Sequence, residues 1–295
     1  FILLLFCIFT ISVSNSYIIL KDGKVGYFYK KFQNIYLNNN FFNEQLRSES
    51  WKYVKDNNFQ EFQSKEKVKI LIVGDSHSKD LFNVFIQNGK LFENYEFLRY
   101  GNNLNADFFN SQKKIGKDFF EFSNSKVFNQ SDIILISNYF NSEESFNYLD
   151  IFLNMFKNKK QIILTSNSNI YLNPRIKFPL KLTLFDEFLL NIKNEEKFID
   201  KNINSSLRIK IQNYYYENRN LDKLNKINTK LKKLAEKHNI QILYKENFQC
   251  DLDKKICFGV TDEGIKSHYD DAHFTLEGAS FFGKRIHETN WLKVN

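Results

Sequence analysis

Short apolar runs alternate with longer stretches of helical periodicity over most of this chain. The apolar runs predict β-strands at residues 68–73, 96–100, 132–137, 161–166 and 240–244. Apolar residues spaced three and four positions apart predict helices at residues 79–87, 145–157, 182–192, 221–238 and 276–288. Strands that alternate with helices are typical of an α/β fold. We therefore expect a mostly parallel five-stranded sheet with helices on both faces.

The first 66 residues follow a different pattern. Residues 1–16 begin with an apolar run that is too short to cross a bilayer from its first residue, and neither an initiator methionine nor a basic flank marks a signal peptide. We interpret it as the end of a transmembrane helix or, alternatively, as the core of a signal segment. Residues 17–66 are expected to form a helical linker packed on the domain. The main domain is expected at residues 67–295, outside the cytoplasm in either case.

The first expected strand ends in Gly74-Asp75-Ser76. A serine at this place lies in a tight turn between a strand and a helix. Its hydroxyl is exposed there, and the helix N-terminus offers free backbone N–H groups to a developing oxyanion. The same tripeptide is a common turn sequence and indicates little by itself. Its position after an unbroken apolar strand makes Ser76 a candidate nucleophile.

Asp270 and His273 near the C-terminus offer partners for such a serine. A serine hydroxyl becomes nucleophilic when an imidazole takes its proton, and a carboxylate fixes the tautomer and orientation of that imidazole. A spacing of three residues lets one turn bring the carboxylate of Asp270 onto the ring of His273. Asp271 is the less favourable partner, because it lies only two residues before the histidine. The sequence therefore predicts a triad of Ser76, His273 and Asp270.

These two blocks resemble the SGNH or GDSL hydrolases, which carry Gly-Asp-Ser near the start of the domain and Asp-x-x-His near its end. The chain is most similar to one branch, the periplasmic SGNH domain that follows an acyltransferase-3 membrane domain in bacterial polysaccharide O-acetyltransferases. Three details favour this branch: His77 after Gly-Asp-Ser, Gly278-Ala279 after His273, and the pair Cys250 and Cys257 upstream of Asp270.

The resemblance implies a three-layer α/β/α, flavodoxin-like fold and an enzyme that needs no metal or other cofactor. The activity it implies is transfer of an acyl group, most simply acetyl, to a hydroxyl of a cell-surface polysaccharide or glycolipid through an acyl-serine intermediate. The partner would be an acyltransferase-3 membrane domain, with the SGNH domain in the periplasm at the bacterial inner membrane. A carbohydrate or lipid esterase with the same triad is the first alternative. A non-catalytic glycan-binding module on an SGNH fold is the second.

The resemblance also implies an oxyanion hole of three groups. They are the backbone N–H of Ser76, a glycine N–H after the second strand and an asparagine side chain after the third. Gly101 follows the second expected strand, and Asn138 follows the third. Both have a plainer interpretation, because Gly101-Asn102 is a turn signal and the chain is rich in asparagine. Gly101 and Asn138 are therefore candidate donors.

His77 directly follows the candidate nucleophile. It could contact substrate, but a histidine in the first turn of a helix is more often a capping or surface group. We interpret His77, like Gly74 and Asp75, as a residue that supports the motif.

Three cysteines occur, and Cys250 and Cys257 frame a short loop. Such a pair can form a disulfide, belong to a metal site or remain as two free thiols. A zinc site would need two more ligands, and His268 and His273 are a poor set. We favour a disulfide that braces the loop carrying Asp270 and His273. It would require an oxidising compartment such as a periplasm.

Composition limits the remaining possibilities. The 295 residues, 42% of them hydrophobic, suffice for one large core and leave little for a second full domain. The net charge is +8, but the lysines are spread along the chain, so we infer no nucleic-acid partner.

Residues 167–220 carry no recognisable motif. Tyr171, Tyr214, Tyr215 and Tyr216 could stack on sugars, although packing is the more frequent role of such residues.

Overall fold

Five strands form one sheet, in the order β2-β1-β3-β4-β5, and every neighbouring pair is parallel. The computed structural model describes residues 43–100, 109, 115–168, 171, 183–191 and 205–294. The strands are β1 (Val68–Val73), β2 (Tyr95–Arg99), β3 (Ile133–Ile136), β4 (Gln161–Thr165) and β5 (Gln241–Leu243). Each lies where the sequence predicts a strand. The expected α/β fold is confirmed, with a sheet that is fully parallel.

The described helices are α2 (Asn43–Asn57), α3 (Ser76–Gln87), α4 (Ile115–Asn124), α5 (Lys126–Gln130), α6 (Glu143–Phe156), α7 (Leu184–Asn191), α8 (Ser205–Glu217), α9 (Leu221–His238), α10 (Glu246–Gln249) and α11 (Leu276–Glu288). A 3-10 helix, η2 (Gly89–Phe92), and a small ribbon of β6 (Cys250–Asp251) and β7 (Ile256–Cys257) complete the described elements. The bounds of α9 and α11 are the predicted ones. By contrast, α3 begins earlier than predicted, at Ser76 itself.

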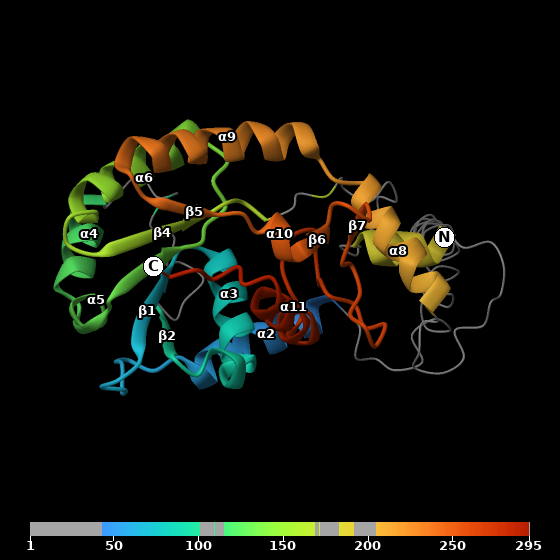
Figure 1. Cartoon of the computed structure of the whole chain (residues 1–295), viewed down its shortest axis with the longest axis horizontal. Helices are drawn as coiled ribbons and strands as arrows, with labels where there is room; N and C mark the ends of the chain where they lie inside the picture. The colour runs from blue at the N-terminus through green and yellow to red at the C-terminus, as the bar shows by residue number, and fades with distance from the viewer. Residues whose placement is uncertain are drawn as a thin grey trace, which may run out of the picture.

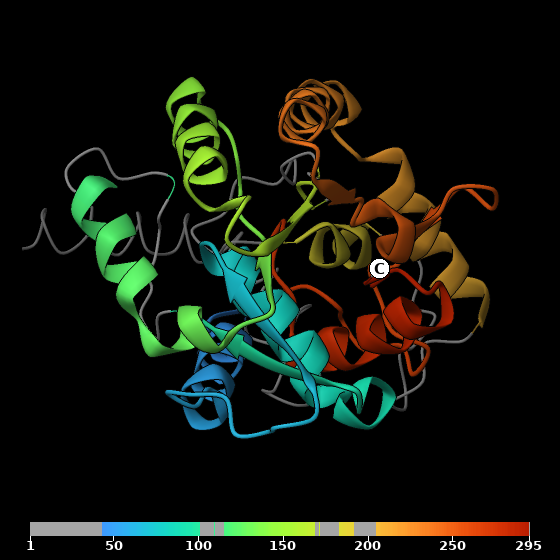
Figure 2. The same cartoon turned by 60° about the vertical axis from the view of Figure 1, so that its left-hand side comes forward.

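Alternate side chains of the strands enter two separate cores. Leu71 and Ile134 point to the face covered by α5, α6 and α9, whereas Ile70 and Leu135 point to the face covered by α2, α3 and α11. Figure 1 shows α6 and α9 on one side of the sheet and α2, α3 and α11 on the other, and Figure 2 separates the same layers from a second direction. The three-layer α/β/α arrangement is thus confirmed.

The winding of the sheet reverses between β1 and β3, which are direct neighbours. In this flavodoxin-like order, the connections after β1 and β3 leave toward opposite faces, and a crevice opens between them. Val73 and Ile136, the last residues of the two strands, are paired in register. The residues that follow these two strands therefore meet at one edge of the sheet.

The connection from β2 to β3 contains two helices that the sequence pattern did not predict, α4 and α5. Phe119 and Phe122 lie three positions apart in α4 and are buried, whereas Phe120 is 67% exposed. This spacing is the helical signal, but it extends over too few residues to stand out in so aromatic a chain.

Helix α2 lies within the predicted linker, residues 17–66, and packs against the domain through Val54, which is fully buried. The apolar segment, residues 1–16, lies outside the described residues. Among the residues that are described, no helix is both long and apolar enough to cross a membrane.

Candidate active site

The turn after β1 presents Ser76 at the first position of α3. Gly74 has a φ of 141°, and a Cβ added there would lie 2.0 Å from the carbonyl oxygen of Ser137, so only glycine fits. Asp75 caps the helix, because its carboxylate accepts the backbone N–H of His77 at 2.9 Å. The N–H of Ser76 lies in the first helical turn, where backbone donors have no partner within the helix. Gly74 and Asp75 thus shape a turn that places Ser76 in the first turn of α3, where its N–H has no partner within the helix.

The structure brings the three predicted triad residues together. Nε2 of His273 lies 2.6 Å from Oγ of Ser76, and Nδ1 of His273 lies 2.8 Å from Oδ2 of Asp270. Oδ1 of Asp270 also accepts the backbone N–H groups of Ala272 (2.9 Å) and His273 (2.7 Å), which closes the turn expected from the three-residue spacing. Asp271 is exposed at the surface. In this geometry the imidazole can take the serine proton while the carboxylate orients the ring.

The charges around the histidine favour its protonated form. Burial by itself would raise the pKa of Asp270, but the hydrogen bond and charge of His273 and two backbone N–H groups lower this pKa to about 2. Burial by itself would lower the pKa of His273. The hydrogen bond with Asp270 and the negative charges of Asp80 and Asp270 outweigh it and raise the pKa of His273. Asp270 therefore stays ionised at neutral pH and can stabilise the imidazolium that forms when Ser76 loses its proton.

Neighbouring residues hold the His273 ring in place. The Tyr269 ring stacks against it at a centroid distance of 5.6 Å and an interplanar angle of 9°, and the His77 ring does so at 4.8 Å and 28°. Phe274 directly follows His273, and Asp80 of α3 accepts its backbone N–H at 3.3 Å. The loop that carries His273 is thus anchored to the helix that carries Ser76.

Asn138 is fully buried just after β3. Its Oδ1 accepts the backbone N–H of Asp75 at 3.0 Å, whereas its Nδ2 has no hydrogen-bond partner. Buried amide groups are normally hydrogen-bonded, so an unpaired donor beside the Ser76 turn suits an oxyanion that forms only during reaction. Gly101 lies outside the described residues, and its role stays a prediction.

His77 is buried and packs beside the candidate base. Burial lowers its pKa well below the usual value, and the positive charges of His273, Lys245 and Lys79 add to this effect. Its Nδ1 lies 3.4 Å from Oγ of Ser168. The structure therefore presents His77 as a neutral ring that stacks on His273.

Three buried cations surround the turn, and sequence reasoning missed all of them: Lys79, Arg99 and Lys245. Nε of Arg99 donates to Oγ of Ser78 at 2.7 Å, and Nζ of Lys245 donates to Oγ of Ser137 at 2.9 Å. Burial lowers the pKa of Arg99 to about 10 and the pKa of Lys245 to about 8. No local pattern in the sequence marks any of these three cations as buried.

Cys250 and Cys257 form a disulfide that joins β6 to β7. The predicted disulfide is confirmed. The alternative zinc site with His268 and His273 is not supported, because both sulfur atoms are consumed. His268 is itself buried, with Nδ1 at 2.7 Å from Oγ of Ser267.

His77, Asp80 and His273 offer potential ligand atoms within 4.8 Å of one another. Both ring nitrogens of His273 already lie within hydrogen-bond distance of Ser76 and Asp270. A metal ion would have to displace one of these partners, so the group is better suited to proton transfer than to metal binding.

A cavity of about 230 Å³ lies at the triad. It is lined by Ser76, Tyr269, Asp270 and His273 together with four residues of α2, namely Asn43, Glu44, Arg47 and Trp51. Pockets for drug-sized ligands typically measure about 300–1,000 Å³. This cavity is therefore suited to a small group. The tyrosines considered as sugar platforms are not among its lining residues, and Tyr171 and Tyr215 are buried in a separate cluster.

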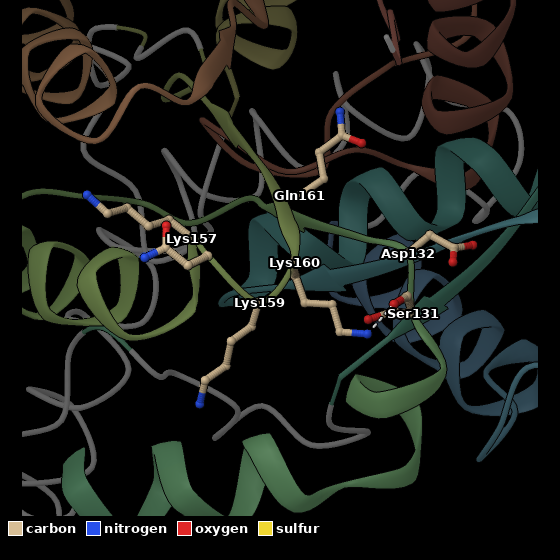
Figure 3. Close-up of a pocket in the computed structure, with 7 residues that line it drawn as sticks. Ser131, Asp132, Lys157, Lys159, Lys160 and Gln161 are labelled. Carbon is tan, nitrogen blue, oxygen red and sulfur yellow. Dashed lines mark hydrogen bonds between the residues drawn. The ribbon is translucent and has the colours of Figure 1, made fainter.

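A larger hollow, of about 490 Å³, lies at the opposite edge of the sheet (Figure 3). It is lined by Ser131, Asp132, Lys157, Asn158, Lys159, Lys160 and Gln161. The ammonium group of Lys160 already donates to the carbonyl oxygens of Asn129 and Ser131. Because these residues lie at the starts of β3 and β4, the hollow is separate from the site at the strands' carboxyl ends.

Comparisons with known proteins define the fold. No protein-family model matches the chain, and no curated protein sequence does. Among solved structures, the chain is similar to the periplasmic domain of a lipopolysaccharide acetyltransferase from Salmonella ser. Paratyphi A, with 14% sequence identity and a TM-score of 0.54. The match covers 82% of this chain and 95% of that domain.

A GDSL-like lipase from Bacteroides thetaiotaomicron is also similar, at 13% identity over 81% of this chain and 95% of that one. Its TM-score of 0.40 is too low to carry weight. At such identities, similarity establishes the fold and nothing finer. The chain thus has the SGNH-type fold that its Gly-Asp-Ser and Asp-x-x-His blocks predict, shared with the Salmonella acetyltransferase domain.

Proposed function

We propose that this protein transfers an acyl group, most simply acetyl, to a hydroxyl of a cell-surface polysaccharide through an acyl-Ser76 intermediate. One observation carries the proposal, the continuous line of contacts from Oγ of Ser76 through the ring of His273 to Asp270. Such a line turns a serine hydroxyl into a nucleophile.

The reaction would proceed in two displacements. His273 Nε2 takes the proton of Ser76 as Oγ attacks the carbonyl carbon of the donor, and the N–H of Ser76 and Nδ2 of Asn138 stabilise the oxyanion. The intermediate collapses, and the leaving group departs with the proton from His273. The acceptor hydroxyl then loses its proton to His273 and attacks the carbonyl carbon of the acyl-serine. As the bond to Oγ breaks, His273 returns the proton to Oγ, and Ser76 is free again.

Two features favour acetyl transfer to a sugar over cleavage of a lipid ester. The similar Salmonella domain belongs to a lipopolysaccharide acetyltransferase. In addition, a cavity of about 230 Å³ suits a short acyl group and one sugar ring better than the long chain of a lipid ester. The disulfide suits an oxidising compartment. We therefore propose a periplasmic location for the domain. The resemblance of the motifs adds the proposal that an acyltransferase-3 membrane domain at the bacterial inner membrane is its partner.

The proposal is tested by following where the acetyl group goes. The full chain is incubated with nitrophenyl acetate, with and without a polysaccharide acceptor, and acetylated glycan and free acetate are quantified in parallel. A transferase should acetylate the glycan at the expense of acetate, and Ser76→Ala should abolish both products. Acetate alone, with no effect of acceptor, would instead establish an esterase. The absence of both products would leave a glycan-binding module.

A further inference from the structure

Helix α2 lies before the first strand of the domain, yet it supplies four of the eight residues that line the cavity at Ser76. These are Asn43, Glu44, Arg47 and Trp51. The triad and its loop form the other part of the lining. The reacting serine therefore faces a wall that the rest of the catalytic machinery does not provide.

This wall is held firmly through Ser50, which is fully buried on the inner side of α2. Nζ of Lys79 donates to Oγ of Ser50 at 2.9 Å, and Nδ2 of Asn83 donates to the Ser50 carbonyl oxygen at 3.0 Å. Oγ of Ser50 in turn donates to the carbonyl oxygen of Phe274 at 3.4 Å. Because Phe274 follows His273 directly, α2 is fixed relative to the candidate base, and its cavity side is preorganised for a ligand.

Two aromatic rings belong to the lining. The indole of Trp51 is partly exposed, and Nζ of Lys79 and Cζ of Arg99 each lie 5.6 Å from its ring centroid. Such cation–π contacts hold an indole in place. Tyr269 is the second ring, but it is buried: it stacks on His273, and Nζ of Lys79 lies 4.8 Å from its ring centroid. Trp51 is therefore the ring that can pack against the apolar C–H face of a sugar.

The polar groups on α2 indicate the charge of the ligand. Nη1 of Arg47 lies 3.5 Å from Oε2 of Glu44, and their side chains are 43% and 73% exposed, so the pair is weak and open to exchange with a ligand. A guanidinium only donates hydrogen bonds and a carboxylate only accepts them. Together they match hydroxyl groups, which do both, and the pair has no net charge that would select an anionic substituent.

We propose that the cavity side of α2 is the acceptor subsite, in which Trp51 stacks on a neutral sugar ring and Arg47 and Glu44 hydrogen-bond to its hydroxyl groups. This assignment rests on the proposed acyl transfer and names its acceptor class. It makes α2 the part of the chain that selects the sugar, and the triad the part that performs the reaction.

Intrinsic fluorescence tests the subsite without turnover, because Trp51 and Trp291 are the two tryptophans of the chain. Trp291 is buried, and its Nε1 donates to the carbonyl oxygen of Tyr244. The full chain is titrated with methyl glucoside, galactoside, mannoside and rhamnoside, and with methyl glucuronide as the acidic comparison. At least one neutral glycoside should produce a saturable change that is absent in Trp51→Phe. Arg47→Ala should weaken binding about tenfold or more, the loss expected for a hydrogen bond to a charged group.

Lys52→Ala is the matched control, since Lys52 is an exposed cation of the same helix and is not among the cavity-lining residues. Its titration should equal that of the wild type. A change that survives in Trp51→Phe, a response to the glucuronide alone, or no response to any neutral glycoside would overturn the subsite.

The same variants separate the subsite from the reaction. Trp51→Phe and Arg47→Ala should slow acetyl transfer to the glycoside, whereas the control Lys52→Ala should leave both transfer and acetate release within about twofold of wild type. Glycoside binding without any acyl-Ser76 would keep the subsite and reject the proposed transfer. Formation of acyl-Ser76 with unchanged transfer in both variants would keep the transfer and reject the subsite.

Discussion

The backbone N–H of Asp75 donates to Oδ1 of Asn138 at 3.0 Å, and the carboxylate of Asp75 accepts the N–H of Tyr139 at the same distance. The turn after β1 and the turn after β3 are therefore joined by two reciprocal hydrogen bonds. Because Oδ1 is committed to Asp75, the amide of Asn138 must present Nδ2 on its other side. One contact thus orients the candidate oxyanion donor relative to the candidate nucleophile.

Asn138 has two groups whose roles substitutions can test: Oδ1 accepts the N–H of Asp75, and Nδ2 is the candidate oxyanion donor. Asn138→Asp keeps an acceptor for the N–H of Asp75 and removes the donor, whereas Asn138→Ala removes both. Both variants should lower kcat for nitrophenyl acetate by roughly 10²–10³-fold, the usual loss for one oxyanion donor. Because Asn138→Asp also buries a carboxylate with one unpaired oxygen, its melting temperature should fall at least as far as that of Asn138→Ala. Wild-type kcat in Asn138→Asp would show that Nδ2 has no part in the reaction.

Gly74 lies in the tight turn after β1, and Gly89, at the start of η2, is its control. A Cβ at Gly74 would meet the Ser137 carbonyl oxygen at 2.0 Å, whereas nothing lies within 4 Å of a Cβ at Gly89. Gly74→Ala should reduce the free energy of unfolding by more than about 2 kcal/mol, because strain and a backbone clash combine. Gly89→Ala should change it by less than about 1 kcal/mol. Denaturant unfolding measures both, and equal values would contradict the turn geometry.

The fold was predictable because each strand is a dense apolar run of the length that a buried parallel strand requires. β1, β3 and β4 bury both faces, so each appears as a short continuous apolar run whose length indicates a strand. The helices that the sequence pattern did not predict, such as α8, have weaker local signals. α8 has only Leu207, Ile211, Gln212 and Tyr215 buried, within a polar segment whose helix depends on tertiary packing.

The pH dependence of the reaction follows from His273. Its pKa is raised above the usual value of 6.5, mainly by the hydrogen bond with Asp270 working against burial, and only the neutral ring can accept the serine proton. Activity should therefore fall as the pH drops through a midpoint above 6.5. Asp80→Asn removes one of the charges that raise this pKa and should move the midpoint to lower pH.

The measurement is kcat/KM against pH, read as acetate release so that the ionisation of nitrophenol does not interfere. A wild-type midpoint at or below 6.5 would contradict the electrostatics of the site. A midpoint that does not move in a well-folded Asp80→Asn variant would remove Asp80 from the groups that act on His273.

The disulfide has a simple chemical test. The chain has three cysteines, of which Cys250 and Cys257 are bonded to each other. Alkylation of the denatured, unreduced chain should therefore label one thiol, and alkylation after reduction should label three. Replacement of both residues by serine should reduce the free energy of unfolding by about 2–4 kcal/mol. Three labels before reduction would contradict the bond.

The triad residues were predictable because each belongs to a short local pattern, a strand-ending Gly-Asp-Ser and an Asp-x-x-His turn. The surroundings were not, because they depend on contacts distant in sequence. Lys79 reaches Ser50 and Tyr269, 29 and 190 positions away. Trp51 and Arg47 reach the cavity because α2 packs against α3 and the loop that carries His273, through contacts of Ser50 that no local pattern in the linker sequence indicates.

The most direct test of the central claim is to trap the acyl-enzyme. The full chain is mixed with nitrophenyl acetate, quenched in acid and digested, and the peptide that carries Ser76 is analysed by mass spectrometry. One acetyl group on Ser76 is expected in the wild type, with none in Ser76→Ala and a strongly reduced amount in His273→Ala. Acetylation that is absent from Ser76, or that persists unchanged in both variants, would contradict a serine-based acyl transfer at this site.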